Sequence, residues 1–166
     1  MPELKYYQAI SAALAEELEA DPTTLVMGED IGGPGGIYAQ TRGLQERFGP
    51  ARVRDTPAGE VGFMGAAVGL ALTGMRPIVE ISFADFFPTC MDQVVNQMAK
   101  IRYMSGGQAS MPVTVMSFGG ARLNAGPQHS GTYEAWLGSI PANRSAAQPF
   151  EIRSAIGTST RHGSPA

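Results

Sequence analysis

A glutamate at the start of a glycine-rich segment is the residue best placed for acid–base chemistry. Glu60 follows the turn at residues 55–59 and opens the segment EVGFMGAAVGLALTGM. A carboxylate at the mouth of a site can share a proton with a ligand nitrogen. The alternative is structural, because an acidic residue in the first turn of a helix stabilises the helix macrodipole. From these residues alone, the structural interpretation is favoured.

Three further candidates have structural interpretations as well. Glu29 and Asp30 precede a glycine-rich loop at residues 31–40, but the spacing matches neither the dinucleotide-binding nor the P-loop pattern. His129 is followed directly by a serine, and such a pair is not a hydrolase triad. Cys90 is expected to be a small buried apolar residue. A plain loop, an exposed histidine and a core cysteine are therefore favoured.

Alternating helix and strand patterns predict an α/β fold. Apolar residues at helical spacing predict helices over residues 4–20, 41–48, 60–75, 85–103 and 133–137. Short apolar runs predict strands over residues 25–27, 52–54, 78–83 and 112–118. This alternation requires a parallel sheet covered by helices on both faces. Ligands of such sheets bind beyond the carboxyl ends of the strands, here at residues 28–36, 57–60, 83–87 and 119–129.

Two helices carry specific expectations. Thr41 is predicted to cap the helix over residues 41–48 with its hydroxyl. The helix over residues 60–75 is apolar almost all round, so we expect it to be buried on every side. Its glycines each cost about 1 kcal/mol relative to alanine, which favours close approach by a neighbouring backbone. Phe86 is expected to pack in the core.

Composition excludes several classes of protein. The 166 residues, 43% of them apolar, are enough for one domain with a real core, which excludes intrinsic disorder. A net charge of -3 without clustered Lys or Arg argues against nucleic-acid binding. No apolar run predicts a membrane helix and no targeting peptide is visible, so a cytoplasmic location is expected. One cysteine and two histidines predict neither a disulfide nor a metal site on this chain.

A family pattern emerges from four linked segments. Between Leu4 and Pro141 the chain contains, in order, MGEDIG, RVRDTPAGEVGFMGAAVGLALTGMRPIVEISFADFF, MDQVVNQMAKIRYMSGGQ and GPQHSGTYEAWLGSIP. These segments resemble the β subunits of thiamine-diphosphate-dependent 2-oxoacid dehydrogenases, which are E1 components of the pyruvate, branched-chain and acetoin dehydrogenase complexes. The resemblance implies a transketolase-like pyrimidine-binding domain, a parallel α/β sandwich, over residues 1–141.

The resemblance also implies roles for four residues. Glu60 matches the glutamate that hydrogen-bonds N1′ of the cofactor's pyrimidine and promotes its imino tautomer. Ala58 and Phe86 match positions that contact the pyrimidine, so the cofactor-binding set is Ala58, Glu60 and Phe86. His129 matches an active-site histidine that takes part in acyl transfer to lipoamide. The implied catalytic residues are therefore Glu60 and His129.

The cofactor and the partners follow from the same resemblance. Thiamine diphosphate is shared with an E1 α subunit, which holds the diphosphate and the magnesium ion, in an α₂β₂ heterotetramer. The implied reaction is oxidative decarboxylation of a 2-oxo acid, with pyruvate as the first expectation, and acyl transfer to a lipoyl-bearing E2 component. An acetoin or branched-chain enzyme is the alternative within the family. A non-catalytic subunit-binding fragment is the alternative of another class.

The last part of the chain does not follow the family pattern. Residues 142–166 contain only three large apolar residues, Phe150, Ile152 and Ile156. We therefore expect no further strand after Pro141 and an unrelated, disordered tail. On this interpretation the chain corresponds to the front portion of the subunit and is truncated, which leaves an open sheet edge.

Overall fold

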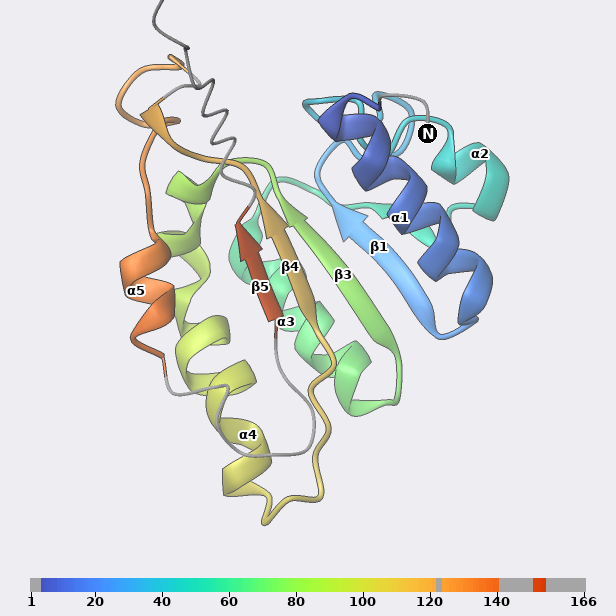
Figure 1. Ribbon diagram of the computed structural model, residues 1–166. Coiled ribbons are helices and arrows are strands. Elements are labelled where there is room, and N and C mark those ends of the chain that lie inside the picture. The colour runs from blue at the N-terminus through green and yellow to red at the C-terminus, as the bar shows by residue number, and fades with distance from the viewer. Residues whose placement is uncertain (1–3, 122–123, 141–150, 155–166) are drawn as a thin grey trace, which may run out of the picture.

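Five parallel strands form one sheet in the computed structural model, which describes residues 4–121, 124–140 and 151–154. The strands are β1 (Thr24–Gly28), β2 (Val53–Asp55), β3 (Arg76–Ile81), β4 (Thr114–Ser117) and β5 (Glu151–Ser154). Their order is β2-β1-β3-β4-β5, and all neighbouring strands are parallel. The arrowheads of β1, β3, β4 and β5 in Figure 1 point toward the same edge. Every residue of β1 is buried, as expected for a strand that is covered on both faces. The predicted parallel α/β fold is confirmed.

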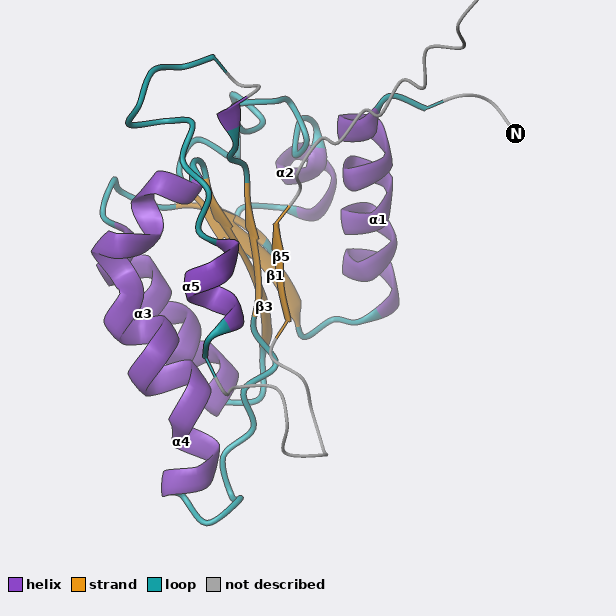
Figure 2. Cartoon of the chain, turned by 60° about the vertical axis from the view of Figure 1, so that its left-hand side comes forward, coloured by secondary structure: helices purple, strands orange, loops and turns teal. Residues whose placement is uncertain are grey.

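Helices cover the two faces of this sheet (Figure 2). One face carries α1 (Tyr6–Ala20) and α2 (Leu44–Phe48). The other carries α3 (Glu60–Leu72), the 3-10 helix η1 (Ala84–Cys90), the π-helix η2 (Gln93–Met98), α4 (Ala99–Met104) and α5 (Glu134–Gly138). Each face has its own cluster of buried apolar side chains. A fully buried aliphatic or aromatic side chain contributes about 1.5–3 kcal/mol, so the two clusters hold the sheet and both helical layers together.

The helical segment from residue 84 to residue 104 is irregular, although one regular helix was predicted over residues 85–103. It begins as a 3-10 helix, continues through the wide π-helical turns of η2 and ends as the α-helix α4. Pro88 lies inside η1 and has no N–H to donate, which explains why α-helical hydrogen bonding cannot run through it. The apolar residues of this segment nevertheless face the core, since Phe87, Cys90 and Val94 are fully buried.

The end of α3 and the start of α2 differ from those predicted. Helix α3 ends at Leu72 because Gly74 adopts a left-handed conformation and the Met75 N–H donates to the Leu70 carbonyl at 3.0 Å. Thr41 does not cap α2, so that prediction is wrong. Its side chain is buried, and its hydroxyl donates to the carbonyl of Ile31 at 2.7 Å. The hydroxyl therefore fixes the preceding loop and not the helix.

One face of α3 is exposed, contrary to the prediction that this helix is buried on every side. The exposed residues are apolar or small and lie on one side of the helix: Val61, Gly62, Ala66, Gly69 and Leu72. The opposite side, including Phe63, Met64 and Ala67, packs on the sheet. An apolar helix that is covered on one side only presents a smooth surface for a partner.

The chain contributes a strand beyond Pro141, where none was expected. Strand β5 pairs in parallel with β4, with Thr114 opposite Glu151 and Ser117 opposite Ser154. The edge of β4 would otherwise leave backbone groups unpaired, and pairing them requires no long apolar run. The remaining residues of the predicted disordered tail, 142–150 and 155–166, lie outside the described residues.

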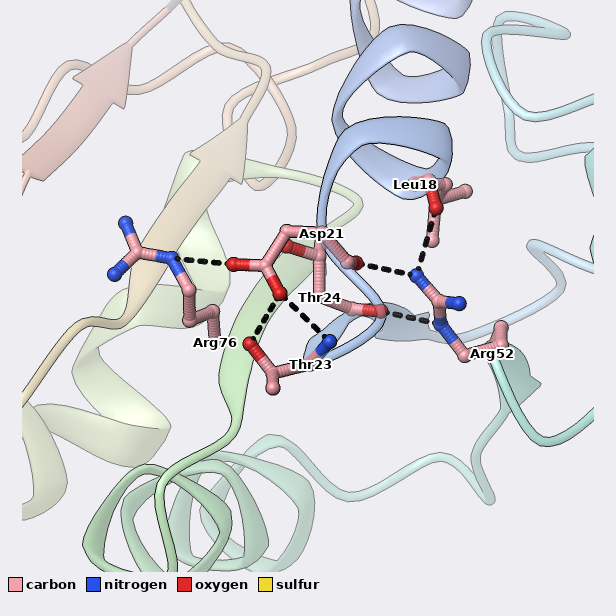
Figure 3. Close-up of polar contacts among 6 residues, drawn as sticks. All are labelled: Leu18, Asp21, Thr23, Thr24, Arg52 and Arg76. Atoms are coloured by element: carbon pink, nitrogen blue, oxygen red, sulfur yellow. Dashed lines mark hydrogen bonds and ion pairs between the residues drawn. The ribbon is translucent and has the colours of Figure 1, made fainter.

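A polar junction fixes the amino ends of the first strands (Figure 3). Arg52 donates to the carbonyl oxygens of Leu18 at 2.9 Å, Asp21 at 2.8 Å and Thr24 at 2.5 Å. The carboxylate of Asp21 accepts from the Thr23 N–H at 2.8 Å and the Thr23 hydroxyl at 2.6 Å. These bonds hold the pKa of Asp21 below its ordinary value. The end of α1 is thus tied to β1 and β2.

Candidate active site

The predicted site segments meet at one edge of the sheet. Parallel strands end at the same edge, so the residues that follow β1, β2, β3 and β4 converge there (Figure 1). Glu29 follows β1, Glu60 follows the turn after β2, Phe83 and Phe86 follow β3, and His129 lies in the segment after β4. This is the edge where ligands bind in sheets of this kind.

Glu60 is the first residue of α3 and is half-buried. Its Oε2 atom lies 3.4 Å from Thr89 Oγ1, whose hydroxyl is only 2.7 Å from the Phe86 carbonyl oxygen. Because a hydroxyl has one proton, it donates to the nearer carbonyl oxygen. The Glu60 carboxylate therefore keeps most of its acceptor capacity for a ligand at the edge.

A second carboxylate supports the turn before Glu60. Glu29 Oε1 accepts a hydrogen bond from the Gly59 N–H at 3.1 Å. Burial raises the pKa of Glu29, and the negative charges of Glu60 and Asp30 raise that pKa further, while the Gly59 hydrogen bond lowers it. From the sequence, Glu29 was assigned to a plain loop. Its position directly after a predicted strand had placed it within an expected ligand-binding segment, residues 28–36, but the bond to Gly59 could not be read from the sequence.

An aromatic cluster surrounds the histidine. The ring of His129 lies edge-on to Phe83, with 4.5 Å between centroids, and to Phe86, with 5.6 Å. The two phenyl rings are themselves 5.7 Å apart in a T-shaped arrangement. All three side chains are half-buried, so the cluster has flat apolar surface next to an imidazole. Phe83 was not singled out in the sequence, where it is only the last residue of a predicted strand.

Three of the four predicted site residues are connected in the structure. Phe86 and His129 are in ring contact, and Thr89 lies between Glu60 and the Phe86 backbone. Ala58 lies in the turn two residues before Glu60, and its side chain is exposed. Phe86 itself is half-buried at the edge of the larger core cluster and not inside it.

Two kinds of feature are missing from the described part of the chain. Within residues 4–121, 124–140 and 151–154, no three acidic, histidine or cysteine side chains are grouped so that they could hold a metal ion. In the same ranges, no helix is both long enough and apolar enough to cross a membrane.

The site and the sheet define a class: an α/β sandwich with a half-buried carboxylate and an aromatic–histidine cluster at the carboxyl ends of parallel strands. The chain belongs to the family of the transketolase pyrimidine-binding domain, whose model matches residues 2–158. That match extends past Pro141 and includes β5. A solved structure described as a split-gene transketolase, inactive β4 tetramer, has the same fold. Its TM-score is 0.58 at 20% identity, covering 78% of this chain and 37% of that chain.

Within this family the chain is similar to β subunits of E1 components. It is 41% identical to the mitochondrial pyruvate dehydrogenase E1 component subunit β-1 of Arabidopsis thaliana, over 93% of this chain and 42% of the relative. It is 41% identical to the acetoin:2,6-dichlorophenolindophenol oxidoreductase subunit β of Bacillus subtilis, over 87% and 46%. It is 36% identical to the 2-oxoisovalerate dehydrogenase subunit β of that bacterium, over 99% and 51%. The chain thus spans about half or less of these relatives.

The residues at the sheet edge fit the aminopyrimidine of thiamine diphosphate, the cofactor that the family and its E1 relatives imply. A carboxylate with remaining acceptor capacity, Glu60, suits a ring nitrogen that carries a proton. The half-buried rings of Phe83 and Phe86 suit the flat, partly apolar face of the pyrimidine.

Proposed function

We propose that this chain forms the pyrimidine-binding part of the β subunit of a 2-oxoacid dehydrogenase E1 component, with pyruvate as the substrate. The observation that carries the proposal is the half-buried Glu60 carboxylate, which stands at the carboxyl edge of the sheet with acceptor capacity to spare. The E1 relatives support the substrate class, and the acetoin and 2-oxoisovalerate enzymes are the alternatives within it.

In this proposal each residue has a defined task. Glu60 shares a proton with the pyrimidine nitrogen N1′ and accepts the hydrogen bond of the protonated nitrogen, and Glu29 keeps Glu60 in place through the Gly59 N–H. Phe86 and Ala58 lie against the pyrimidine ring, and His129 assists acyl transfer to lipoamide. When bound, thiamine diphosphate supplies the electron sink for decarboxylation. An E1 α subunit completes an α₂β₂ assembly and holds the diphosphate and the magnesium ion, and an E2 component provides the lipoyl group.

Replacing the acid–base group tests the proposal directly. In a complete β subunit assembled with its α subunit, Glu60→Gln should retain the fold and weaken cofactor binding by about 1–3 kcal/mol. Turnover should fall about 10²-fold or more, since an amide cannot share a proton with the ring nitrogen as a carboxyl group can. Calorimetric titration with thiamine diphosphate and exchange of its C2 proton measure the two effects.

The matched control is Glu46→Gln, which changes another glutamate in the first turn of a helix, α2. It should leave both binding and C2 exchange unchanged. Near-normal C2 exchange in Glu60→Gln would mean that Glu60 only stabilises the start of α3, and the proposed function would then be wrong.

The histidine is tested through its separate half-reaction. In the assembled complex, His129→Ala should reduce acyl transfer to lipoamide much more than it reduces decarboxylation. An artificial electron acceptor reports decarboxylation, and reduction of NAD by the whole complex reports the overall reaction. Equal losses in the two assays, or none in either, would remove the role from His129.

A second candidate function is subunit binding without catalysis. It is favoured by the exposed face of α3, where small and apolar side chains from Val61 to Leu72 remain uncovered. An α subunit that binds this chain tightly but shows no cofactor-dependent C2 exchange in the resulting complex would establish this function. Exchange that depends on Glu60 would exclude it.

Two further assignments belong to the proposal. We place the end of the domain beyond Pro141, the boundary predicted from the sequence, because the family match to residue 158 includes β5. A cytoplasmic location stays a prediction, since the relatives include both plant proteins named mitochondrial and bacterial proteins. Fractionation of the source cell tests it.

A further inference from the structure

An aspartate after β3 anchors the segment that carries His129. This histidine segment is defined here as residues 124–131. The Gly131 N–H lies 3.1 Å from both Oδ1 and Oδ2 of Asp85, so the carboxylate accepts this backbone hydrogen bond. A bond from an N–H to an ionised carboxylate is stronger than one between neutral groups. The aspartate thus links the turn after β3 to the segment after β4.

The contact depends on the absence of a side chain at Gly131. A Cβ atom there would overlap Asp85 Oδ1 and crowd the ring of Tyr133. The Gly131 carbonyl accepts the Gly120 N–H at 2.9 Å, which ties the end of the histidine segment to the backbone just after β4. Glycine therefore allows the backbone to approach the carboxylate closely.

Bonds within the histidine segment extend the anchor to His129. The His129 N–H donates to the Gly126 carbonyl at 3.3 Å, and the Ala125 N–H donates to the Ser130 hydroxyl oxygen at 3.2 Å. The segment is thus folded on itself, and Gly131 is only two residues from His129. Fixing Gly131 to Asp85 consequently limits where the imidazole can lie.

We propose that Asp85 is a positioning residue that holds the His129 imidazole against Phe83 and Phe86. Asp85 lies between these two phenylalanines in the chain, so one short turn provides both the anchor and the two rings. Its catalytic significance rests on the proposed function of His129, whereas the anchoring itself does not. The simpler alternative is that Asp85 only stabilises the first turn of η1.

Proton NMR of the whole chain tests the anchor without any enzyme assay. The chain has two histidines, His129 and His162, so a His162→Gln variant assigns their ring resonances. Edge contact with two phenyl rings displaces the His129 resonances from the positions they have in the urea-unfolded chain. Asp85→Ala should move them toward those unfolded positions. Asp85→Asn retains an acceptor oxygen of the same shape and should keep them near the parent values.

The matched control removes a similar anchor elsewhere. Asp55 accepts the Gly32 N–H at 2.7 Å and thereby fixes a different loop after a neighbouring strand. Asp55→Ala should leave the His129 resonances in place. Unchanged His129 resonances in a folded Asp85→Ala chain, or equal displacement in Asp85→Ala and Asp55→Ala, would overturn the proposal.

Amide exchange of the unmodified chain provides a test that does not depend on a variant folding. A Gly131 N–H bonded to a carboxylate should exchange markedly more slowly than the same amide in the unfolded chain. Exchange of Gly131 at the unfolded rate would overturn the anchor.

Activity then separates this inference from the function on which it rests. In the assembled complex, Asp85→Ala should lower acyl transfer about tenfold or more through misplacement of His129 and leave decarboxylation near normal. If His129→Ala has no effect on acyl transfer, the proposed function of His129 fails while the NMR result stands. If His129→Ala is defective and Asp85→Ala is not, the positioning role fails alone.

Discussion

Glu80 is a carboxyl group buried inside the sheet, away from the candidate site. It alternates along β3 with Val79 and Ile81, which face the α3 layer, so it faces the layer of α1 and α2. The residue is 1% exposed, and none of the described residues makes a hydrogen bond with either carboxylate oxygen. Burial raises the pKa of Glu80 to about 7, and the nearby Gln40 amide offsets only part of this.

This carboxyl group predicts a pH-dependent stability. A folded-state pKa of about 7 against an ordinary 4.5 means that the folded chain holds the proton where the unfolded chain has lost it. The free energy of unfolding should therefore fall as pH rises from about 4.5 to 7, by up to about 3 kcal/mol. Glu80→Gln should remove this fall. Urea unfolding at pH 5 and pH 8 measures the difference.

The control for this prediction is Glu46→Gln, which changes an exposed glutamate of α2. It should keep the pH dependence of the parent chain. If Glu80→Gln loses stability between pH 5 and pH 8 by the same amount as the parent, Glu80 is not the group responsible.

The sequence predicted some of these residues and not others, for a physical reason. Glu60, Phe86 and His129 lie in short segments whose residue order is specific, so the family resemblance identified them. The surroundings of Asp85 and Glu80 are formed by groups distant in sequence, the Gly131 N–H for Asp85 and the packed helices and strands for Glu80. No local sequence pattern predicts these surroundings. Period-two alternation in β3 separates Glu80 from Val79, but it does not reveal that the second face is buried as well.

At the scale of elements, the junction between α1, β1 and β2 depends on one side chain. Arg52 donates to three carbonyl oxygens, those of Leu18, Asp21 and Thr24, around the end of α1 (Figure 3). Carbonyl groups at the end of a helix have no partner within the helix. The guanidinium is thus a cap that reaches the helix end from the turn before β2.

Removing this cap should destabilise the fold measurably. Arg52→Ala should lower the free energy of unfolding by about 2–4 kcal/mol, because three carbonyl groups lose a charged donor in a half-buried position. Arg52→Lys should recover only part of the loss, since an ammonium group lacks the planar fork. Urea denaturation followed by circular dichroism measures both.

Arg54→Ala serves as the comparison, because Arg54 has the same charge and lies two residues further along, in β2, but is exposed. Its effect should stay within about 0.5 kcal/mol. Similar losses for the Arg52 and Arg54 variants would show that net charge matters and the cap does not.

The boundaries of elements were harder to predict than their existence. Apolar spacing indicated a helical segment over residues 85–103, yet it could not reveal the change from 3-10 to π geometry, because the same residues face the core in either form. Thr41 has the residue type of a helix cap, but the loop carbonyl of Ile31 competes successfully for its hydroxyl.

At the scale of the whole molecule, the exposed face of α3 predicts an association surface. Gly69 lies on that face, and a Cβ atom there would meet no atom within 4 Å. Gly69→Leu should therefore stabilise the chain alone by about 0.5–1 kcal/mol through helix propensity. The same leucine should weaken binding of an E1 α subunit about tenfold or more, because it overfills a closely packed contact. Thermal unfolding and calorimetric titration measure the two effects.

The comparison variant is Ala9→Leu, which adds a leucine at an exposed position of α1 on the opposite layer. Its affinity for the α subunit should equal that of the parent chain. Undiminished binding by the Gly69 variant would place the association surface elsewhere.

The parallel arrangement of the first four strands was predictable. Alternating helices and strands indicate a parallel sheet, but they do not give its strand order, β2-β1-β3-β4-β5. The fifth strand was not predictable, because backbone pairing with β4 completes an edge that apolar patterning does not describe. The same limit applies to α3, since composition alone does not say which of its sides the chain itself covers.

The rate at which Cys90 can be labelled reports how often the structure around it opens. Cys90 is the only cysteine, it is fully buried in η1, and burial together with the charge of Glu60 raises the pKa of its thiol to about 12. Alkylating reagents attack the thiolate, so they can modify Cys90 only after η1 has separated from α3. Because η1 also carries Phe86 and Thr89, the labelling rate in excess reagent measures how often this wall of the candidate site comes apart.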